Sequence, residues 1–186
     1  GNKGANDMIA VSGIGSYSSK AAGSDKSYSV SNLSLTNNPN GNYSLAASSV
    51  TGSDGEITAK PITVTYAAAN KVYDGTTAAT VTAGSAGVIS GDKVTFSQSA
   101  VFADKNAATG KTVNISDIAL GGDDKKNYSL SATTSTAAAD ITKRTLIISA
   151  VHDSKVYDGQ LTSSAAPEAS GIQTGDSING LVQAYT

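Results

Sequence analysis

One short stretch occurs twice in this chain, and it constrains the fold more than any other feature of the sequence. Residues 71–75 and residues 155–159 both read Lys-Val-Tyr-Asp-Gly. A fixed period of this kind is typical of proteins built from copies of one supersecondary unit. The sequence therefore predicts a module of about 84 residues that is repeated along the chain.

Other matches keep nearly the same period. Gly91-Asp92 recurs as Gly175-Asp176, and the Asn-Tyr-Ser-Leu stretch at 42–45 recurs at 127–130, one position later than the period of the pentapeptide requires. The matches divide the chain into three segments: the first segment (1–59) is the later part of one unit, the middle segment (60–143) is a complete unit, and the last segment (144–186) is the opening half of a third unit. This division predicts that the chain belongs to a longer array.

Composition excludes several classes of function. The chain has no Cys, so it has neither disulfides nor thiolate chemistry. Charged residues make up only 15% of the chain and the net charge is −2, which offers no electrostatic footprint for nucleic acid. No apolar run approaches the ~20 residues of a membrane-spanning helix. With no Trp and 2 Phe, the 8 Tyr must supply much of the aromatic packing.

Apolar and polar residues alternate along most of the chain, which is the pattern of half-buried strands. Ile62, Val64 and Tyr66 share one face, and Tyr43 and Leu45 predict a strand in the first segment. We expect about seven strands and no helix in the middle segment. The predicted fold class is all-β, with tandem small β-sandwich or β-grasp-like modules in an elongated array. The alternative is a parallel β-solenoid, although no period of ~20 residues is visible.

Five landmarks occur in order in the middle segment: Lys-Val-Tyr-Asp-Gly at 71–75, Gly-Asp at 91–92, Val-Phe-Ala-Asp-Lys at 101–105, Asn-Tyr-Ser-Leu at 127–130 and Ala-Asp-Ile-Thr at 139–142. This set resembles the YDG repeat, a glycine-rich, mostly β module of large bacterial surface adhesins. It is similar to the repeats of filamentous-haemagglutinin-like proteins exported by two-partner secretion. The resemblance implies an extracellular or cell-surface adhesin whose tandem modules form a stalk, and it brings no catalytic residues.

The repeated pentapeptide supplies the candidate structural motif, whose members are Lys71, Tyr73, Asp74, Gly75, Lys155, Tyr157, Asp158 and Gly159. We expect the aspartates to form turns by accepting hydrogen bonds from nearby amides, and the glycines to provide a positive φ. We expect each tyrosine ring to pack into its own module with its hydroxyl bonded to the backbone. The alternative is that these rings stack on a glycan.

Two other tyrosines are candidates for glycan contact because their counterparts differ. Tyr17 aligns with Phe102, and Tyr185 aligns with Val101 at the period of the last segment. An aromatic ring that is present in one unit only would serve a ligand rather than the module. An intramolecular isopeptide bond at Lys71 or Lys155 would require a buried acid beside the lysine.

No cofactor is predicted. Asp123 with Asp124, Asp54 with Glu56, and Asp92 offer oxygen ligands for Ca²⁺, but no Asp-x-Asp-x-Asp spacing is present, so we expect solvated loop charges. His152 is the only histidine, and no Ser-His-Asp pattern recurs, so we expect no metal site and no enzyme activity. Asn-x-Ser sequons begin at four positions, which are Asn32, Asn42, Asn114 and Asn127.

Three hypotheses of function follow. The first is a structural stalk or spacer of a large secreted or surface-anchored bacterial adhesin, involved in adhesion, aggregation or biofilm, whose partners are the neighbouring repeats of the same chain. The second is a module that binds carbohydrate or extracellular matrix. The third is a filament-forming segment in which identical chains associate through exposed strand edges.

Overall fold

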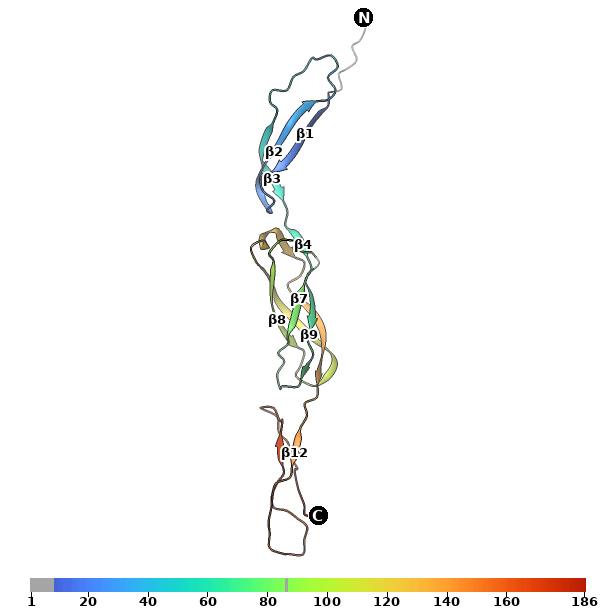
Figure 1. The fold of residues 1–186 in the computed structure, drawn as a ribbon, viewed down its shortest axis with the longest axis vertical. Coiled ribbons are helices and arrows are strands. Elements are labelled where there is room, and N and C mark those ends of the chain that lie inside the picture. Colours follow the sequence, from blue (N-terminus) through green and yellow to red (C-terminus); the bar gives the residue numbers. More distant parts are fainter. Residues whose placement is uncertain (1–8, 86) are drawn as a thin grey trace. The chain divides into compact units, whose positions relative to one another are not determined.

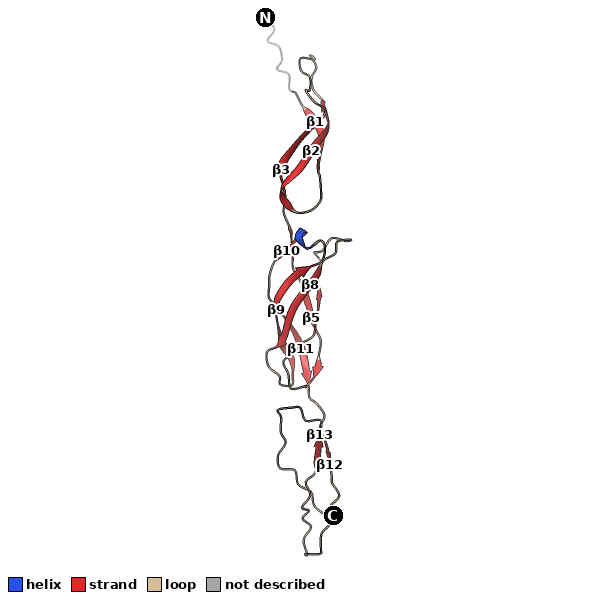
Figure 2. Ribbon diagram, turned by 90° about the vertical axis from the view of Figure 1, so that its left-hand side faces the viewer, coloured by secondary structure: helices blue, strands red, loops and turns tan. Residues whose placement is uncertain are grey.

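The computed structural model describes residues 9–85 and 87–186, and these residues form an all-β protein. Figure 2 shows strands joined by loops, with one short 3₁₀ turn, η1 (Lys125–Asn127). No helix among the described residues has the length and apolar character needed to cross a membrane. The strands, which can be followed by colour in Figure 1, are β1 (Val11–Tyr17), β2 (Gly23–Leu35), β3 (Val50–Ile57), β4 (Lys60–Ile62), β5 (Thr65–Ala68), β6 (Lys71–Val72), β7 (Val81–Gly84), β8 (Thr95–Phe102), β9 (Ala108–Gly121), β10 (Tyr128–Leu130), β11 (Ser135–Thr142), β12 (Ile147–Ser149) and β13 (Glu168–Ser170).

The chain folds into two compact units whose limits differ from those of the three sequence segments. Unit 1 takes the described part of Gly1–Ile62 together with Gly87–Thr95 and Leu120–Ser131. Unit 2 takes the rest, which is Thr63–Ala86, Phe96–Ala119 and Ala132–Thr186. The middle segment therefore contributes residues to both units.

Unit 1 holds an antiparallel sheet in the order β1-β2-β3. Its register pairs Tyr17 with Tyr28 and Val30 with Val50. A second pairing in this unit is parallel: β10 runs beside β4, with Tyr128 opposite Lys60. The amide of Ser131 continues this pairing by donating to the carbonyl oxygen of Ile62 at 3.0 Å.

Most of unit 2 is built on a sheet in the order β6-β11-β9-β8. β11 is antiparallel to β9 and parallel to the short strand β6, so the four strands form a mixed sheet. The antiparallel ribbon β5-β7 lies against this sheet through contacts between β5 and β11. In the last segment, β12 and β13 form a separate antiparallel ribbon.

Strands at equivalent sequence positions adopt the same arrangement. The order β1-β2-β3 corresponds to β8-β9-β11, which lie one repeat period further along the chain. Both long middle strands contain a left-handed residue at the same place, Asn32 (φ 54°) in β2 and Asp117 (φ 55°) in β9. The two ribbons also share their register, since Thr65 faces Gly84 in β5-β7 and Ser149 faces Glu168 in β12-β13.

The buried apolar side chains among the described residues all come from the middle segment. They are Ile62, Val64, Phe102, Val113, Ile115, Ile118, Tyr128, Ala139 and Ile141. Alternation explains pairs such as Val113 and Ile115, because residues two apart on a strand point to the same face, whereas Ile118 lies three residues after Ile115, beyond the left-handed Asp117. The sheet β1-β2-β3 has no such interior, and every residue of β1 is exposed.

One expectation about a strand was wrong. Residues 43–45 form no strand, and Tyr43 is 58% exposed, whereas the matching residues 128–130 form β10. β10 exists because β4 lies beside it, and among the described residues no strand pairs with residues 43–45. The described part of the middle segment contains eight strands, β4 to β11, where about seven were expected.

Candidate functional site

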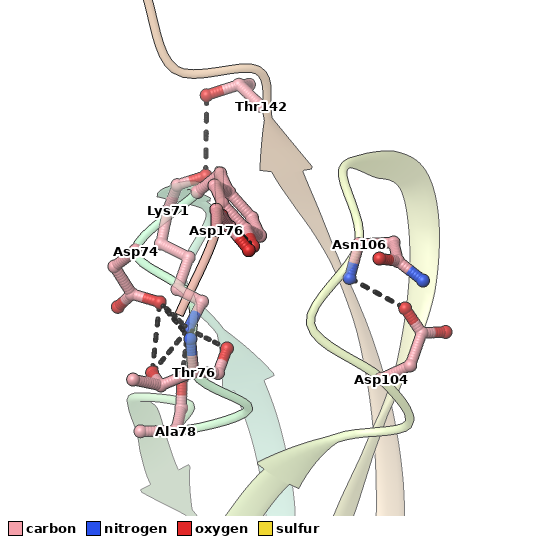
Figure 3. Close-up of polar contacts among 9 residues, drawn as sticks. Lys71, Asp74, Thr76, Ala78, Asp104, Asn106, Thr142 and Asp176 are labelled. Carbon is pink, nitrogen blue, oxygen red and sulfur yellow. Dashed lines mark hydrogen bonds and ion pairs between the residues drawn. The ribbon is translucent and has the colours of Figure 1, made fainter. Parts of the chain in front are cut away.

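The first Lys-Val-Tyr-Asp-Gly motif forms a turn that is closed by its own lysine (Figure 3). Nζ of Lys71 lies 2.9 Å from Oδ1 of Asp74 and 2.9 Å from the carbonyl oxygens of Thr76 and Ala78. Oδ1 of Asp74 also accepts a hydrogen bond from the amide of Thr76 at 2.9 Å. One ammonium group therefore donates hydrogen bonds to three oxygens of the turn, and the Lys71 side chain is only 18% exposed.

The four-stranded sheet positions this turn. β6 pairs with the end of β11, with Lys71 opposite Ile141 and Val72 opposite Thr142. The amide of Tyr73 then donates to the carbonyl oxygen of Thr142 at 2.9 Å. The motif begins as a short edge strand and becomes a turn where that pairing ends.

The second copy of the motif has the same geometry. Nζ of Lys155 lies 2.9 Å from Oδ1 of Asp158 and 2.8 Å from the carbonyl oxygen of Gln160. The amide of Gln160 donates to Oδ1 of Asp158 at 3.0 Å. The turn therefore keeps its lysine–aspartate core although Gln160 replaces Thr76.

Each motif lysine lies over an aromatic ring. Nζ of Lys71 is 5.4 Å from the ring centroid of Phe102, and Nζ of Lys155 is 5.4 Å from that of Tyr185. The alignment of Tyr185 with Val101 was wrong. The amide of Tyr185 donates to Leu161, as that of Phe102 donates to Thr77, each at 2.8 Å, so the spacing shortens by one residue in the last segment. Tyr185 therefore takes the place of Phe102 beneath the lysine.

The glycines of the motif occupy the left-handed region. Gly75 has φ 78° and Gly159 has φ 72°. A residue with a side chain would be strained there. The tight return of the chain after each aspartate depends on this conformation.

The expectation for the motif tyrosines was wrong in two parts: the hydroxyl of Tyr73 bonds a side chain rather than the backbone, and the Tyr157 ring lies in solvent. The hydroxyl of Tyr73 donates to Oδ2 of Asp176 at 2.7 Å, a carboxylate 103 residues further along the chain. Lys105 lies 5.9 Å from the centroid of the Tyr73 ring. Tyr157 is 93% exposed. The motif aspartates shape the turn, whereas the tyrosines project from it.

The electrostatics of the turns follow from these contacts. The hydrogen bond from Lys71, followed by that from the amide of Thr76, lowers the pKa of Asp74 from 3.8 to about 2. The pKa of Asp158 is also lowered, first by Lys155 and then by the amide of Gln160. Both carboxylates are therefore held in the charged form, as acceptors rather than as proton donors.

Tyr17 lies on the β1-β2-β3 sheet and is 46% exposed. Its hydroxyl donates to the carbonyl oxygen of Glu56 at 3.3 Å, and its ring meets that of Tyr28 edge to face at a centroid distance of 6.2 Å. Tyr17 thus contacts its own sheet, at the sequence position equivalent to the buried Phe102.

Tyr157 and Tyr185 border one shallow hollow of about 380 Å³ in the last segment. Its polar lining residues are Ser154, Lys155, Asp158 and Gln160. Two aromatic rings beside hydroxyl, amide and carboxylate groups form a surface that suits a small polar ligand with apolar faces. This hollow is the place in the described chain where two of the tyrosines singled out from the sequence meet.

The candidate calcium ligands do not converge. Oδ2 of Asp124 accepts from the amide of Lys93 at 2.8 Å, Asp123 forms a 3.7 Å ion pair with Lys93, and Asp54 accepts from Tyr28 at 3.0 Å. Within residues 9–85 and 87–186, no group of three or more His, Cys, Asp or Glu side chains could hold a metal ion.

The remaining candidates are placed as follows. Asn127 accepts a hydrogen bond from the amide of Ala22 at 2.9 Å through its side-chain oxygen, while Asn32 and Asn114 lie in β2 and β9. The acid beside Lys71 is Asp74, whose side chain is 45% exposed, so it is not the buried acid that an isopeptide bond requires. His152 is exposed.

Sequence reasoning missed two ion pairs at equivalent positions. Lys20 pairs with Asp92 at 3.1 Å, and Lys105 pairs with Asp176 at 3.2 Å. The signal was present in the sequence, because the two Gly-Asp dipeptides match, and the match of Tyr17 with Phe102 places Lys20 opposite Lys105. The alignment gave no reason to pair a lysine of one segment with an aspartate of the next.

A polar network in the last segment was also missed. Asp153 accepts hydrogen bonds from the hydroxyl of Ser163 at 2.6 Å and from the amide of Ser164 at 2.9 Å. Gln183 bonds both backbone groups of Val151, donating to its carbonyl oxygen at 2.7 Å and accepting from its amide at 3.0 Å. Ser163 and the neighbouring amides lower the pKa of Asp153 to about 2.

Comparison with known families shows that the family model described as "YDG domain" matches residues 2–51 and 58–137. Comparison with curated proteins and with solved structures gives no significant match.

Proposed function

Because the chain belongs to the YDG domain family, we propose that it is a stalk or spacer segment of a large bacterial adhesin, secreted or anchored at the cell surface. In this proposal the segment acts outside the cell, in adhesion, aggregation or biofilm, and holds a separate adhesive region away from its base. Its partners are the neighbouring modules of the same chain.

One observation carries the proposal, which is that equivalent strands recur with the same order and irregularities. The arrangement β1-β2-β3 is repeated by β8-β9-β11, including the left-handed residues at Asn32 and Asp117. The ribbon β5-β7 is repeated by β12-β13 in the same register. We infer that the chain is a tandem array of small β-sandwich-like modules, each with an opening ribbon and a closing sheet.

The mechanism of such a spacer is mechanical. β9 and β11 are joined by an antiparallel ladder that extends from Ile115 opposite Ser135 to Ala108 opposite Ile141. Backbone hydrogen bonds of this kind are individually modest, but they must break together when a strand is pulled along its length. The lysine-closed turn at Lys71 fixes the edge strand of the same sheet.

Small-angle X-ray scattering on a duplicated chain tests the proposal. A second copy of residues 60–143, inserted after Lys143, keeps the phase of the array. We expect the maximum particle dimension to rise with each inserted copy by the same increment, because every module adds one step to a linear array.

The matched control is an out-of-phase insertion of residues 60–101 at the same point, which adds half a module and should leave strands without partners. A maximum dimension that stays nearly constant when the in-phase copy is inserted would contradict the spacer function. If the chain with the out-of-phase insertion were as fully folded as the chain with the in-phase insertion, the module boundaries would be wrong.

A second candidate function, carbohydrate binding, is favoured by the hollow between Tyr157 and Tyr185. Aromatic faces beside Asp158 and Gln160 offer stacking and hydrogen bonding to a sugar ring. A glycan array probed with residues 1–186 tests it, with Tyr157→Ala as the variant and Tyr43→Ala, another exposed tyrosine, as its control. Binding that both variants retain would exclude the hollow as the site.

A further inference from the structure

The two ion pairs that the repeat alignment missed occupy equivalent positions. Lys20 and Lys105 match at the repeat spacing, and each follows a strand, β1 or β8, that ends three residues earlier. Asp92 and Asp176 match at the period of the pentapeptide, which is one residue shorter than the spacing of the lysines, and each follows a glycine in the left-handed region, with φ 95° and φ 91°. In both cases the lysine belongs to one sequence segment and the aspartate to the next.

Each pair lies inside one compact unit. Lys20 and Asp92 belong to unit 1, and Lys105 and Asp176 belong to unit 2. The geometry is nearly the same, since Nζ lies 3.1 Å from Oδ1 in the first pair and 3.2 Å from Oδ1 in the second. A chance surface contact would have no reason to recur at the repeat spacing.

The second oxygen of each carboxylate is also used in the same way. Oδ2 of Asp92 accepts from the hydroxyl of Tyr128 at 2.6 Å, and Oδ2 of Asp176 accepts from that of Tyr73 at 2.7 Å. The tyrosine hydroxyl, followed by the lysine, lowers the pKa of both carboxyls. Each aspartate is thus a charged acceptor with one oxygen for a lysine and one for a tyrosine.

The two tyrosines belong to different segments relative to the aspartate that they bind, so the tyrosine is not the feature shared by the two positions. Tyr128 lies in the same segment as Asp92, whereas Tyr73 lies in the segment that precedes Asp176. The lysine comes from the preceding segment in both cases. The constant feature is therefore the ion pair between consecutive segments, and the tyrosine orients the carboxylate.

We propose that the aspartate of each Gly-Asp turn is a docking site for the preceding YDG module, whose lysine (Lys20 or Lys105) it binds. This inference rests on the proposed function as a tandem array and adds the contact by which one module is fixed to the next. Both lysines reach solvent, with side chains 83% and 43% exposed, and an ion pair with a solvated member contributes little to stability, so its effect is on orientation. The lysine limits the range of angles between consecutive modules.

Distance measurements by pulsed electron paramagnetic resonance test the proposal on the full chain. The absence of Cys allows two nitroxide labels to be placed without background, at Ser99→Cys in β8 and Ser170→Cys in β13. Both positions are exposed, and both belong to unit 2. The width of the distance distribution reports how firmly the last segment is held.

We expect Asp176→Asn to broaden this distribution and Lys105→Asp to broaden it further, because the second change places two carboxylates together. The exchanged pair, Lys105→Asp with Asp176→Lys, should restore the narrow distribution. Glu168→Gln, which removes one negative charge from the same segment, is the control and should leave the width unchanged. Circular dichroism of every variant checks that the strands remain folded.

A width that Asp176→Asn leaves unchanged, or that the exchanged pair fails to restore, would overturn the proposal. Labels at Thr51→Cys and Ser129→Cys, both in unit 1, give an independent test of Asp92→Asn. A response in unit 2 without one in unit 1 would overturn the claim that the contact recurs. The widths are measured independently of the scattering experiment. Failure of the spacer function and failure of the lysine–aspartate contact are therefore distinguishable.

Discussion

The ring beneath the motif lysine provides the sharpest test of how these sheets are stabilised. Phe102 in β8 is 2% exposed, whereas Tyr17, at the equivalent position of β1, is 46% exposed. Removal of a fully buried Phe side chain costs about 3–5 kcal/mol in unfolding free energy. At ~25 cal/mol per Å² and ~200 Å² per ring, a ring with about half of its area buried contributes roughly 2–3 kcal/mol.

Matched amides allow the two sites to be compared in one sample. The amide of Ala103 donates to the carbonyl oxygen of Thr112 at 2.9 Å, and the amide of Ser18, which is the equivalent residue in the first segment, donates to Ser27 at 2.9 Å. Hydrogen exchange at these amides, followed by NMR, measures the opening of each sheet. Since ~1.4 kcal/mol corresponds to a tenfold change in an equilibrium constant, Phe102→Ala should reduce the protection factor of the Ala103 amide by about a hundred-fold or more.

Tyr17→Ala should reduce protection at Ser18 by a smaller factor than Phe102→Ala does at Ala103. Phe102→Leu, which keeps most of the buried volume, is the control and should cost less than about 1.5 kcal/mol. The reasoning is refuted if Phe102→Ala lowers protection at Ala103 by less than tenfold, or if the exposed ring has the larger effect.

Two further predictions concern the turns. Gly75→Ala should lower the unfolding free energy by about 1–2 kcal/mol in urea titrations because φ is 78° there, whereas Gly84→Ala, without a positive φ, should change it less. In acid, Asp74 and Asp153 have a pKa of about 2 in the folded chain, below 3.8, so both carboxylates stabilise the fold above pH 3.8. That contribution should disappear as the pH falls through about 2, and a circular dichroism titration of Asp74→Asn should show a smaller loss over this range.

Local features of the sequence predicted local features of the structure. The alternation at Ile62 and Val64 places both side chains in the interior, at 2% and 8% exposure. The Asp-Gly of each pentapeptide predicted a turn with a positive φ, and Gly75 and Gly159 have one. These features depend on residues within a few positions of each other, so that one sequence is enough to indicate them.

Contacts between distant residues could not be predicted in the same way. Tyr43 and Tyr128 lie in the same Asn-Tyr-Ser-Leu sequence, but only Tyr128 joins a strand, because β4 lies beside it. Tyr73 and Tyr157 share a pentapeptide, yet the first binds Asp176 and the second is exposed. Identical local sequence cannot specify which partner lies opposite, and the candidate site depends on those partners.

The polar network of the last segment has a consequence for how such a chain folds. Asp153, Ser163 and Gln183 stand where the middle segment has Ala69, Ala79 and Ala100. Adjacent domains of similar sequence are prone to exchange strands during folding. A segment carrying Gln183 would meet an alanine instead of Ser163 in the neighbouring segment, and its amide would lose the hydrogen bond to the Ser163 hydroxyl. This mismatch discourages hybrid assemblies and helps each stretch of chain find its own partners.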